Sequence, residues 1–351
     1  MSSLLDSLDR YAKPAKLFEA LPDSVVRCLA CAHTCTLSPG KRGICMVRWN
    51  KDGVLYAPSG YVSGAQADPI EKKPFFNFLP GNIALTFGML GCNFHCSFCQ
   101  NWLTTQVVRD ATIQPMGNLI NPISPRDLVE YALFNKAKII ASSYNEPLIS
   151  SEWAVEIFSL AKKEGLRCVF VSNGYATPDS IRFLQPYLDG YKIDLKTMQP
   201  KQYRALGGDL NAVLDTIRLC VELGLWVEVV TLVIPDYNDS TEELWEAARF
   251  LVSISSDIPW HVTAFHPDYN MQDRPPTSSD ILQKAADIGL EAGLHHVYAG
   301  NISTHLGSLE DTLCPNCHST LVRRRGFRVL ENRMTSTGLC PQCSTKIAGV
   351  W

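Results

Sequence analysis

Three cysteines in the first third of the chain are the residues whose spacing is best suited to chemistry. Cys92, Cys96 and Cys99 follow an apolar run at 83–90 that reads as a buried strand, so they lie in the loop at its carboxyl end. Soft thiolates select zinc, copper(I) or iron–sulfur clusters. No fourth cysteine is near, so a cubane cluster bound here would keep its fourth iron open to a ligand from outside the protein. The alternatives are a zinc site completed from elsewhere and three unrelated buried cysteines. Structural zinc sites, however, favour paired Cys-x2-Cys halves.

A second group of cysteines lies upstream of this loop, among glycines that let the backbone wrap tightly around a small centre. It consists of Cys28, Cys31, Cys35 and Cys45. Four thiolates could bind zinc or a second iron–sulfur cluster, and the spacing alone does not choose between them. A structural role is favoured because closed four-thiolate sites are usually structural. His33 could replace one thiol, although a solvent-facing position is the preferred interpretation.

A third group closes the chain as two Cys-x2-Cys knuckles on either side of a basic ribbon at 323–328. Its members are Cys314, Cys317, Cys340 and Cys343. This arrangement is typical of a zinc ribbon. The arginines between the knuckles are interpreted as a solvated hairpin face rather than as a nucleic-acid contact.

The composition is that of an ordinary globular protein, with 351 residues, 46% of them hydrophobic and 19% charged. The net charge of −3 gives no electrostatic reason to expect nucleic acid as a partner. No apolar run of about 18 residues and no signal-peptide layout is present, so no membrane partner is expected. Eleven of the thirteen cysteines fall into the three groups, which favours a cytoplasmic metal protein over a secreted disulfide scaffold.

The elements that must position these cysteines alternate between strand and helix from residue 83 onward. Strand-like apolar runs are predicted at 83–90, 137–144, 166–172, 190–195, 225–234, 259–265 and 294–299. Helical patterns are predicted at 124–136, 150–164, 177–188, 210–223, 240–255 and 278–292. Pro125 and Pro178 suit the first helical position, and Ser240 with Glu243 predicts a capping box.

This alternation predicts an α/β fold, a partial or closed parallel β/α barrel with right-handed crossovers. An open doubly wound sheet is the alternative, but no Gly-x-Gly-x-x-Gly follows a strand. We expect N-terminal helices and the four-cysteine module at 1–82, the barrel at 83–305 and the zinc-ribbon-like tail at 306–351. Functional residues of such barrels lie at the carboxyl ends of the strands.

The cysteine loop resembles the signature of the radical S-adenosylmethionine (SAM) enzymes, with the aromatic Phe98 before its last cysteine. The segment 144–147, Tyr-Asn-Glu-Pro, stands where those enzymes carry Gly-Gly-Glu-Pro. Segments 194–198 and 233–235, with Asn173 and His266, are similar to parts of the pyruvate formate-lyase-activating enzymes. The whole chain resembles the AmmeMemoRadiSam-system radical SAM enzymes, which are activating-enzyme relatives.

Two positions depart from the activating-enzyme pattern. Val171 stands where an Asp is expected, which puts the associated cation site in doubt, and Val230 falls where an Arg is expected. The four upstream cysteines also precede the cluster loop, whereas the ferredoxin-like inserts of activating enzymes follow it. The resemblance therefore carries over the chemistry of SAM cleavage but not the substrate.

Polar residues at successive strand ends suit the charged groups of SAM. The predicted cofactor-binding residues are Tyr144, Asn145, Glu146, Ser172, Asn173, Asp194, Lys196 and His266. Glu146 can accept a charge-assisted hydrogen bond from an ammonium, and Lys196 can face a carboxylate. Ser172 and Asn173 suit ribose hydroxyls. The alternatives are a simple Asp194–Lys196 ion pair and an ordinary turn at Asn-Glu-Pro.

The resemblance implies a radical SAM oxidoreductase. Such an enzyme cleaves SAM reductively at a 4Fe-4S cluster and forms a 5′-deoxyadenosyl radical that abstracts hydrogen. It also implies an electron donor such as a ferredoxin or flavodoxin, and glycyl-radical-type activation or modification of a partner protein is favoured. No general acid or base is assigned. A non-enzymatic iron–sulfur and zinc scaffold or electron-transfer protein is the alternative function, and a zinc-ribbon nucleic-acid binder is opposed by the acidic charge balance.

Overall fold

The computed structural model describes residues 2–114 and 117–351, and its centre is an eight-stranded, mostly parallel sheet. The seven parallel strands follow one another in space in chain order, and one antiparallel strand lies beside the first of them. From the antiparallel edge they are β8 (Gly64–Pro69), β9 (Ile83–Gly88), β11 (Ile139–Ser142), β12 (Arg167–Ser172), β13 (Gly190–Asp194), β14 (Trp226–Val233), β15 (Trp260–Ala264) and β16 (Val297–Gly300). All seven predicted strands are therefore confirmed, and their mostly apolar sequences match their burial.

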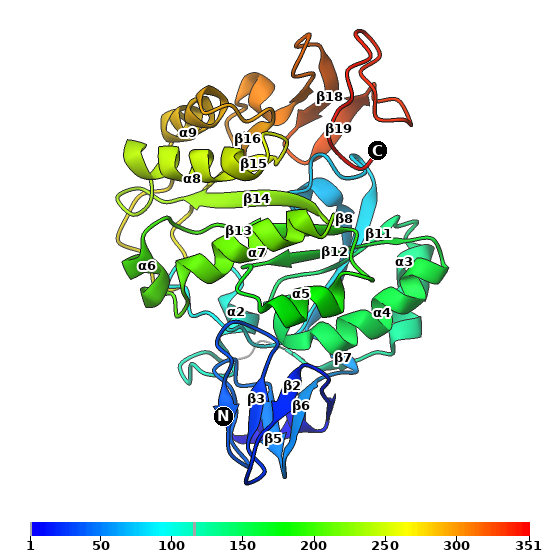
Figure 1. Ribbon diagram of the computed structural model, residues 1–351, viewed down its shortest axis with the longest axis vertical. Coiled ribbons are helices and arrows are strands. Elements are labelled where there is room, and N and C mark those ends of the chain that lie inside the picture. The colour runs from blue at the N-terminus through cyan, green and yellow to red at the C-terminus, as the bar shows by residue number, and fades with distance from the viewer. Residues whose placement is uncertain (1, 115–116) are drawn as a thin grey trace.

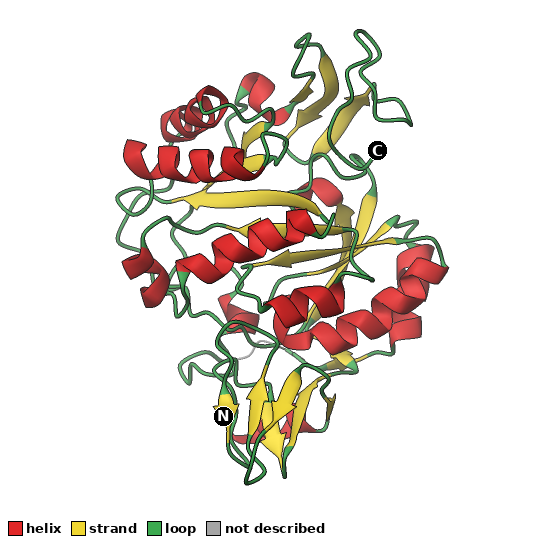
Figure 2. Cartoon of the chain, viewed as in Figure 1, coloured by secondary structure: helices red, strands yellow, loops and turns green. Residues whose placement is uncertain are grey.

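Each predicted helix is present between two of these strands (Figures 1 and 2). They are α3 (Pro125–Phe134), α4 (Ser151–Lys163), α5 (Pro178–Leu184), α7 (Leu210–Glu222), α8 (Thr241–Ile254) and α9 (Ser279–Glu291). Helix α4 packs on β11 and β12, α7 on β14, and α9 on β15 and β16. The short helices α2 (Trp102–Thr105) and α6 (Pro200–Ala205) and the turns η1 (Ile70–Lys72), η2 (Pro147–Ser150) and η3 (Gly307–Glu310) were not expected from the sequence. Among the described residues, none of the helices combines the length and apolar character needed to cross a membrane.

The helix starts follow the expected chemistry with one exception. Pro125 and Pro178 do occupy the first turns of α3 and α5. The Ser240 hydroxyl does cap α8 by accepting the Glu243 amide at 3.2 Å. The reciprocal half of the predicted capping box is wrong, because the Glu243 carboxylate instead accepts the Met198 amide at 2.7 Å. This carboxylate therefore ties the start of α8 to the loop after β13.

The barrel is partial rather than closed. In the part of the chain that the structure describes, no ladder joins the edge strands β8 and β16. Side chains of the segment after β8 fill this side instead. The hydroxyl of Tyr298 on β16 donates to Asn77 Oδ1 at 2.5 Å, and the Phe76 ring lies 4.7 Å from the Tyr298 ring.

The N-terminal module differs from the expected N-terminal helices. One helix, α1 (Ser2–Asp9), is present, but short antiparallel strands follow it. They are β1 (Ala12–Pro14), β2 (Phe18–Ala20), β3 (Val26–Cys28), β4 (Thr36–Leu37), β5 (Trp49–Lys51), β6 (Val54–Pro58) and β7 (Tyr61–Val62), with β7 paired to β10 (Asn121–Pro122). Pro14 and Pro22 are incompatible with a helix interior here, and the chain forms three small sheets instead, β1-β6-β5, β2-β3-β4 and β10-β7.

The C-terminal module is a small antiparallel sheet of β17 (Thr312–Leu313), β18 (Thr320–Arg325) and β19 (Arg328–Asn332). Figure 1 shows it at the upper end of the view, opposite the N-terminal module at the lower end.

We expect Phe87→Ala to destabilise the protein by about 3–5 kcal/mol because it leaves a cavity between β9 and α4. Phe87 is fully buried, and its ring lies 5.5 Å from Trp153 and 6.4 Å from Phe158. Chemical denaturation followed by fluorescence measures the change. Phe134→Ala is the matched control, because that ring is 83% exposed and its loss should change stability by about 0.5 kcal/mol or less.

Candidate active site

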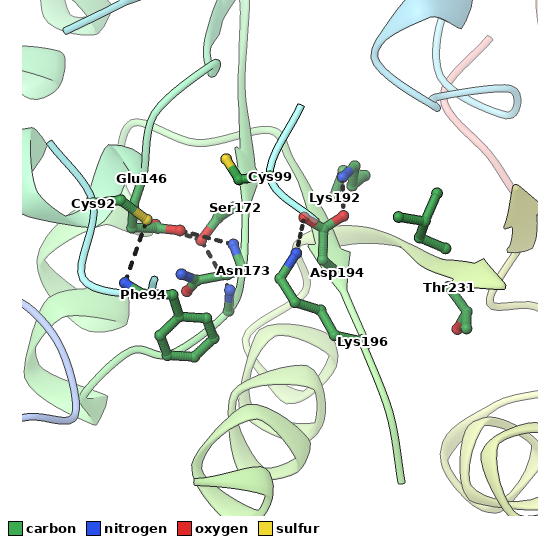
Figure 3. Close-up of polar contacts among 12 residues, drawn as sticks. Cys92, Phe94, Cys99, Glu146, Ser172, Asn173, Lys192, Asp194, Lys196 and Thr231 are labelled. Carbon is green, nitrogen blue, oxygen red and sulfur yellow. Dashed lines mark hydrogen bonds and ion pairs between the residues drawn. The ribbon is translucent and has the colours of Figure 1, made fainter. Parts of the chain in front are cut away.

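A cavity of about 410 Å³ lies at the carboxyl ends of the strands, and the predicted residues from different strands converge on it (Figure 3). The three loop cysteines and seven of the eight predicted cofactor-binding residues line its wall. They are Cys92, Cys96, Cys99, Tyr144, Asn145, Glu146, Ser172, Asn173, Asp194 and Lys196. The exception is His266, which lies at the surface outside this lining. Its Nε2 is 3.1 Å from the carbonyl oxygen of Asn301.

The cysteine loop is held at the end of β9 by hydrogen bonds from neighbouring strand ends. The Met89 amide donates to Asn145 Oδ1 at 3.0 Å, and Asn173 Nδ2 donates to Asn93 Oδ1 at 2.7 Å. These bonds join the loop to the polar residues after β11 and β12. The loop therefore has one defined position relative to the rest of the cavity.

The three thiols have the surroundings of metal ligands. The Phe94 amide donates to Cys92 Sγ at 3.4 Å, and Cys99 Sγ lies 3.2 Å from Thr105 Oγ1. Hydrogen bonds to the sulfurs are one of the means by which proteins tune iron–sulfur clusters. Burial raises the pKa of Cys96 to about 11, so this thiol keeps its proton until a metal replaces it.

Glu146 is a buried carboxylate with three donors already in place. Its Oε1 accepts the Ser172 hydroxyl at 2.7 Å and the Leu148 amide at 3.0 Å, and its Oε2 accepts the Asn173 amide at 2.8 Å. A carboxylate offers about four acceptor positions, so one position remains on Oε2 for a ligand. Burial raises the pKa of Glu146 to about 7, despite these hydrogen bonds.

The Ser172 hydroxyl has no capacity left for a ligand. It donates to Glu146 and accepts hydrogen bonds from the Gly174 amide at 3.0 Å and the Tyr191 hydroxyl at 3.1 Å. The sequence analysis predicted that Ser172 contacts ribose hydroxyls, but its hydroxyl makes all of its hydrogen bonds within the protein. In the structure Ser172 orients Glu146.

Two lysines hold Asp194 on the opposite wall of the cavity (Figure 3). Lys196 Nζ lies 3.1 Å from Asp194 Oδ2, and Lys192 Nζ contacts the other carboxylate oxygen. Burial opposes the charge on Asp194, but Lys192 and Lys196 outweigh it and lower the pKa of Asp194 to about 2. With two ammonium groups facing one carboxylate, this wall carries a net positive charge, which suits an anionic ligand group.

Several residues of the cavity were missed by the sequence analysis. Lys192 shares the strand face of Asp194, so the period of two along β13 could have indicated it. His261 also lines the cavity, with Nε2 2.7 Å from the buried Glu228 carboxylate. Lys73 comes from the segment that fills the open side of the barrel, and it lies 4.6 Å from the Tyr144 ring. No local sequence signal places this segment there.

The four C-terminal cysteines form a compact thiol group at the ends of the small antiparallel sheet. All four Sγ atoms lie within 4.8 Å of one another, with Cys314–Cys343 at 3.6 Å and Cys317–Cys340 at 3.7 Å. Hydrogen bonding by the side chain and amide of Thr345 lowers the pKa of Cys343 to about 6, which favours the thiolate that binds metals. The group can therefore bind a single metal ion.

Comparison with known proteins agrees with this site. Residues 87–251 match the family model of the Radical SAM superfamily. The matched segment contains the cysteine loop and the strand ends up to α8. The chain therefore contains a Radical SAM superfamily domain, and this superfamily implies a 4Fe-4S cluster and SAM. It is 35% identical over 338 residues to the uncharacterized protein MJ0808 of Methanocaldococcus jannaschii, covering 95% of this chain and 98% of that protein.

More distant relatives include activating enzymes. The chain is 22% identical over 232 residues to the pyruvate formate-lyase 1-activating enzyme of Escherichia coli K12, covering 60% of this chain and 89% of that enzyme. It is 21% identical over 187 residues to the pyruvate formate-lyase-activating enzyme of Streptococcus mutans, covering 51% and 69%. A radical SAM methyltransferase from Sphaerobacter thermophilus shares the fold at a TM-score of 0.50 and 14% identity, over 86% of this chain and 81% of that one.

We expect Glu146→Gln to weaken SAM binding by about 1–1.5 kcal/mol, because a charge-assisted hydrogen bond becomes a neutral one. In the wild type, SAM affinity should fall as the pH drops through about 7, because Glu146 then takes up a proton and loses its charge. Calorimetric titration with SAM at several pH values measures both effects. The variant should lose this pH dependence, whereas Glu130→Gln, on the exposed face of α3, should retain it.

Proposed function

We propose that this protein is an AmmeMemoRadiSam-system radical SAM enzyme in which Cys92, Cys96 and Cys99 bind the 4Fe-4S cluster. The observation that carries the proposal is that these three thiols share one cavity with Glu146 and the Asp194–Lys196 pair. These three thiolates would bind three irons of the cluster and would leave the fourth open to SAM. When bound, the cluster and SAM supply one-electron chemistry that releases a 5′-deoxyadenosyl radical.

The chain's own residues bind and orient SAM. The free acceptor position of Glu146 Oε2 receives the SAM amino group, and Ser172 and Asn173 hold this carboxylate in place. Lys196 faces the SAM carboxylate. Burial opposes the charge on Lys196, but Asp194 more than compensates and raises the pKa of Lys196, so it stays cationic. Tyr144 and Asn145 complete this wall of the SAM pocket beside Glu146.

The substrate of the reaction is proposed to be a partner protein, activated or modified by hydrogen abstraction, in an oxidoreductase reaction of the activating-enzyme kind. The activating enzymes among its relatives support this choice. Val171 and Val230 are the two positions at which this chain departs from the activating-enzyme pattern. Both line the cavity and make its wall more apolar than the expected Asp and Arg would. The substrate group that enters the cavity is therefore proposed to differ from that of pyruvate formate-lyase activation.

Further assignments follow from the same proposal. We propose three units, at 1–82, 83–305 and 306–351, and a ferredoxin or flavodoxin as the electron donor. All thirteen cysteines are free thiols, which suits a cytoplasmic location where thiols stay reduced.

The last unit, at 306–351, is proposed to be a zinc ribbon, because thiols about 3.6–3.7 Å apart fit one tetrahedral ion with metal–sulfur bonds of about 2.3 Å.

Cys96→Ala should abolish SAM cleavage because the cluster loses one of its three protein ligands. The measurement is 5′-deoxyadenosine formation by the anaerobically reconstituted chain, with dithionite as reductant. Cys220→Ala is the matched control, since that buried thiol sits alone on α7 and should leave cleavage unchanged. A wild-type chain that carries a reduced cluster and still does not cleave SAM would contradict the proposed activity.

Cys340→Ala should remove bound zinc and lower the thermal stability of the C-terminal unit, because a structural metal contributes directly to folding. Metal analysis of the purified chain measures the zinc. Cys168→Ala, a buried cysteine of β12, should retain the wild-type zinc content. Equal zinc in both variants would contradict the zinc-ribbon assignment.

A further inference from the structure

The four N-terminal cysteines form a second thiol centre directly beside the cysteine loop of the active site. Cys28, Cys31 and Cys45 are buried and Cys35 is partly exposed. The Cys28 amide donates to the Cys35 carbonyl at 2.9 Å, so the backbone brings these two ligand-bearing residues side by side. The segment just before Cys45 also lies beside Cys35, because a Cβ added at Gly43 would lie 3.6 Å from Cys35 Sγ.

The spacing of these thiols differs from that of the C-terminal group. Among residues 2–114 and 117–351, the C-terminal cysteines are the one group with three or more ligand atoms all within 4.8 Å. No three of the N-terminal thiols come that close together, and neither do the three thiols of the 92–99 loop. A single ion draws its thiolates together, whereas in a polynuclear cluster each thiolate binds a different iron. The N-terminal thiols are therefore spaced more widely than a single bound ion would hold them, as are the thiols of the 92–99 loop.

A buried ion pair lies beside this centre. Arg48 is 1% exposed, and its guanidinium bonds both carboxylate oxygens of Glu152 on α4 at 2.8 Å. The Gly43 amide donates to the Arg48 carbonyl at 2.9 Å, so the pair fixes the segment that carries Cys45 against α4.

The backbone connects the two thiol centres. A Cβ added at Gly91 would lie 3.0 Å from the Cys45 carbonyl oxygen, so the residue before Cys92 touches a ligand-bearing residue of the other centre. Arg109 bridges both segments, since its Nη2 donates to the carbonyl of Ile44 at 3.0 Å and also to the carbonyl of Cys92.

Asn93 forms a second link between the centres. His33 Nε2 lies 3.0 Å from its carbonyl oxygen, so His33 lies partly buried between the two centres rather than facing solvent. The Asn93 side chain is fully buried, and its Nδ2 makes no well-formed hydrogen bond while it lies beside the Cys31 thiol. A cluster bound to Cys31 would supply the sulfur acceptor that this amide lacks.

We propose that Cys28, Cys31, Cys35 and Cys45 bind a second iron–sulfur cluster, which delivers electrons to the cluster of the Cys92 loop. The delivery role rests on the proposed function, whereas the cluster itself does not. A low-potential ferredoxin or flavodoxin gives one electron to the second cluster at its exposed side, near Cys35. That cluster is reduced by one electron and returns to its oxidised form when the electron passes through the Asn93 and Arg109 contacts to the active-site cluster. No bond forms or breaks and no proton moves in this step.

The cluster is tested on the full chain with Cys92→Ala, Cys96→Ala and Cys99→Ala combined, reconstituted anaerobically. We expect this variant to retain iron and acid-labile sulfide for one cluster, against two in the wild type. After dithionite reduction it should give an electron paramagnetic resonance (EPR) signal that SAM does not change, because four thiolates leave no open iron. Zinc in place of iron and sulfide would overturn the proposal. If the triple variant fails to fold, a wild-type count of only one cluster would overturn it equally.

The delivery role is tested with Cys28→Ala combined with Cys31→Ala, which should keep the active-site cluster and its EPR response to SAM. We expect this variant to lose SAM cleavage driven by reduced ferredoxin and by reduced flavodoxin, while it keeps cleavage driven by dithionite. An equal loss with all reductants, or no loss with any, would overturn delivery. A wild type that cleaves no SAM with any reductant would refute the proposed function instead and leave the metal analysis to decide the second cluster.

Discussion

The site depends on the hydrogen bonds that the buried Glu146 carboxylate accepts. It collects donors from two strand ends, the amide of Leu148 after β11 and the hydroxyl and amide of Ser172 and Asn173 at the end of β12. Asn173 in turn donates to Asn93, so the same network positions the cysteine loop. A buried acceptor without these donors would cost stability, which is why the strand ends must stay in register. Ligand recognition and loop geometry are thus consequences of one hydrogen-bonded group.

The two ends of the chain are fixed to the barrel by buried arginines. Arg48 of the N-terminal module pairs with Glu152 on α4, and Arg324 of the C-terminal module pairs with Glu71 at 3.5 Å and donates to the Phe76 carbonyl at 2.7 Å. Removing one partner of a buried pair leaves an uncompensated charge at a cost of about 3–5 kcal/mol. The N-terminal module is therefore fixed beside the cysteine loop, and the C-terminal module is fixed at the cavity wall.

The sequence predicted the barrel well because its strands are long apolar runs and its helices begin with clear caps. The strands before residue 38, β1 to β4, were missed, because stretches of two or three residues show no periodicity. At the site, residue types predicted Glu146 and Lys196 as site residues, and both line the cavity. They could not show that the hydroxyl of Ser172 is fully bonded or that His266 lies outside the cavity, since both depend on tertiary contacts. The closeness of the two thiol centres also required the folded backbone.

The most direct test of the account is electron–nuclear double resonance (ENDOR) spectroscopy of the reduced wild-type chain with SAM labelled at its amino nitrogen. If Cys92, Cys96 and Cys99 leave one iron open and Glu146 orients the amino group toward it, the reduced cluster will show hyperfine coupling to the labelled nitrogen. Absence of that coupling, in a sample whose cluster is fully reduced and saturated with SAM, would contradict the account.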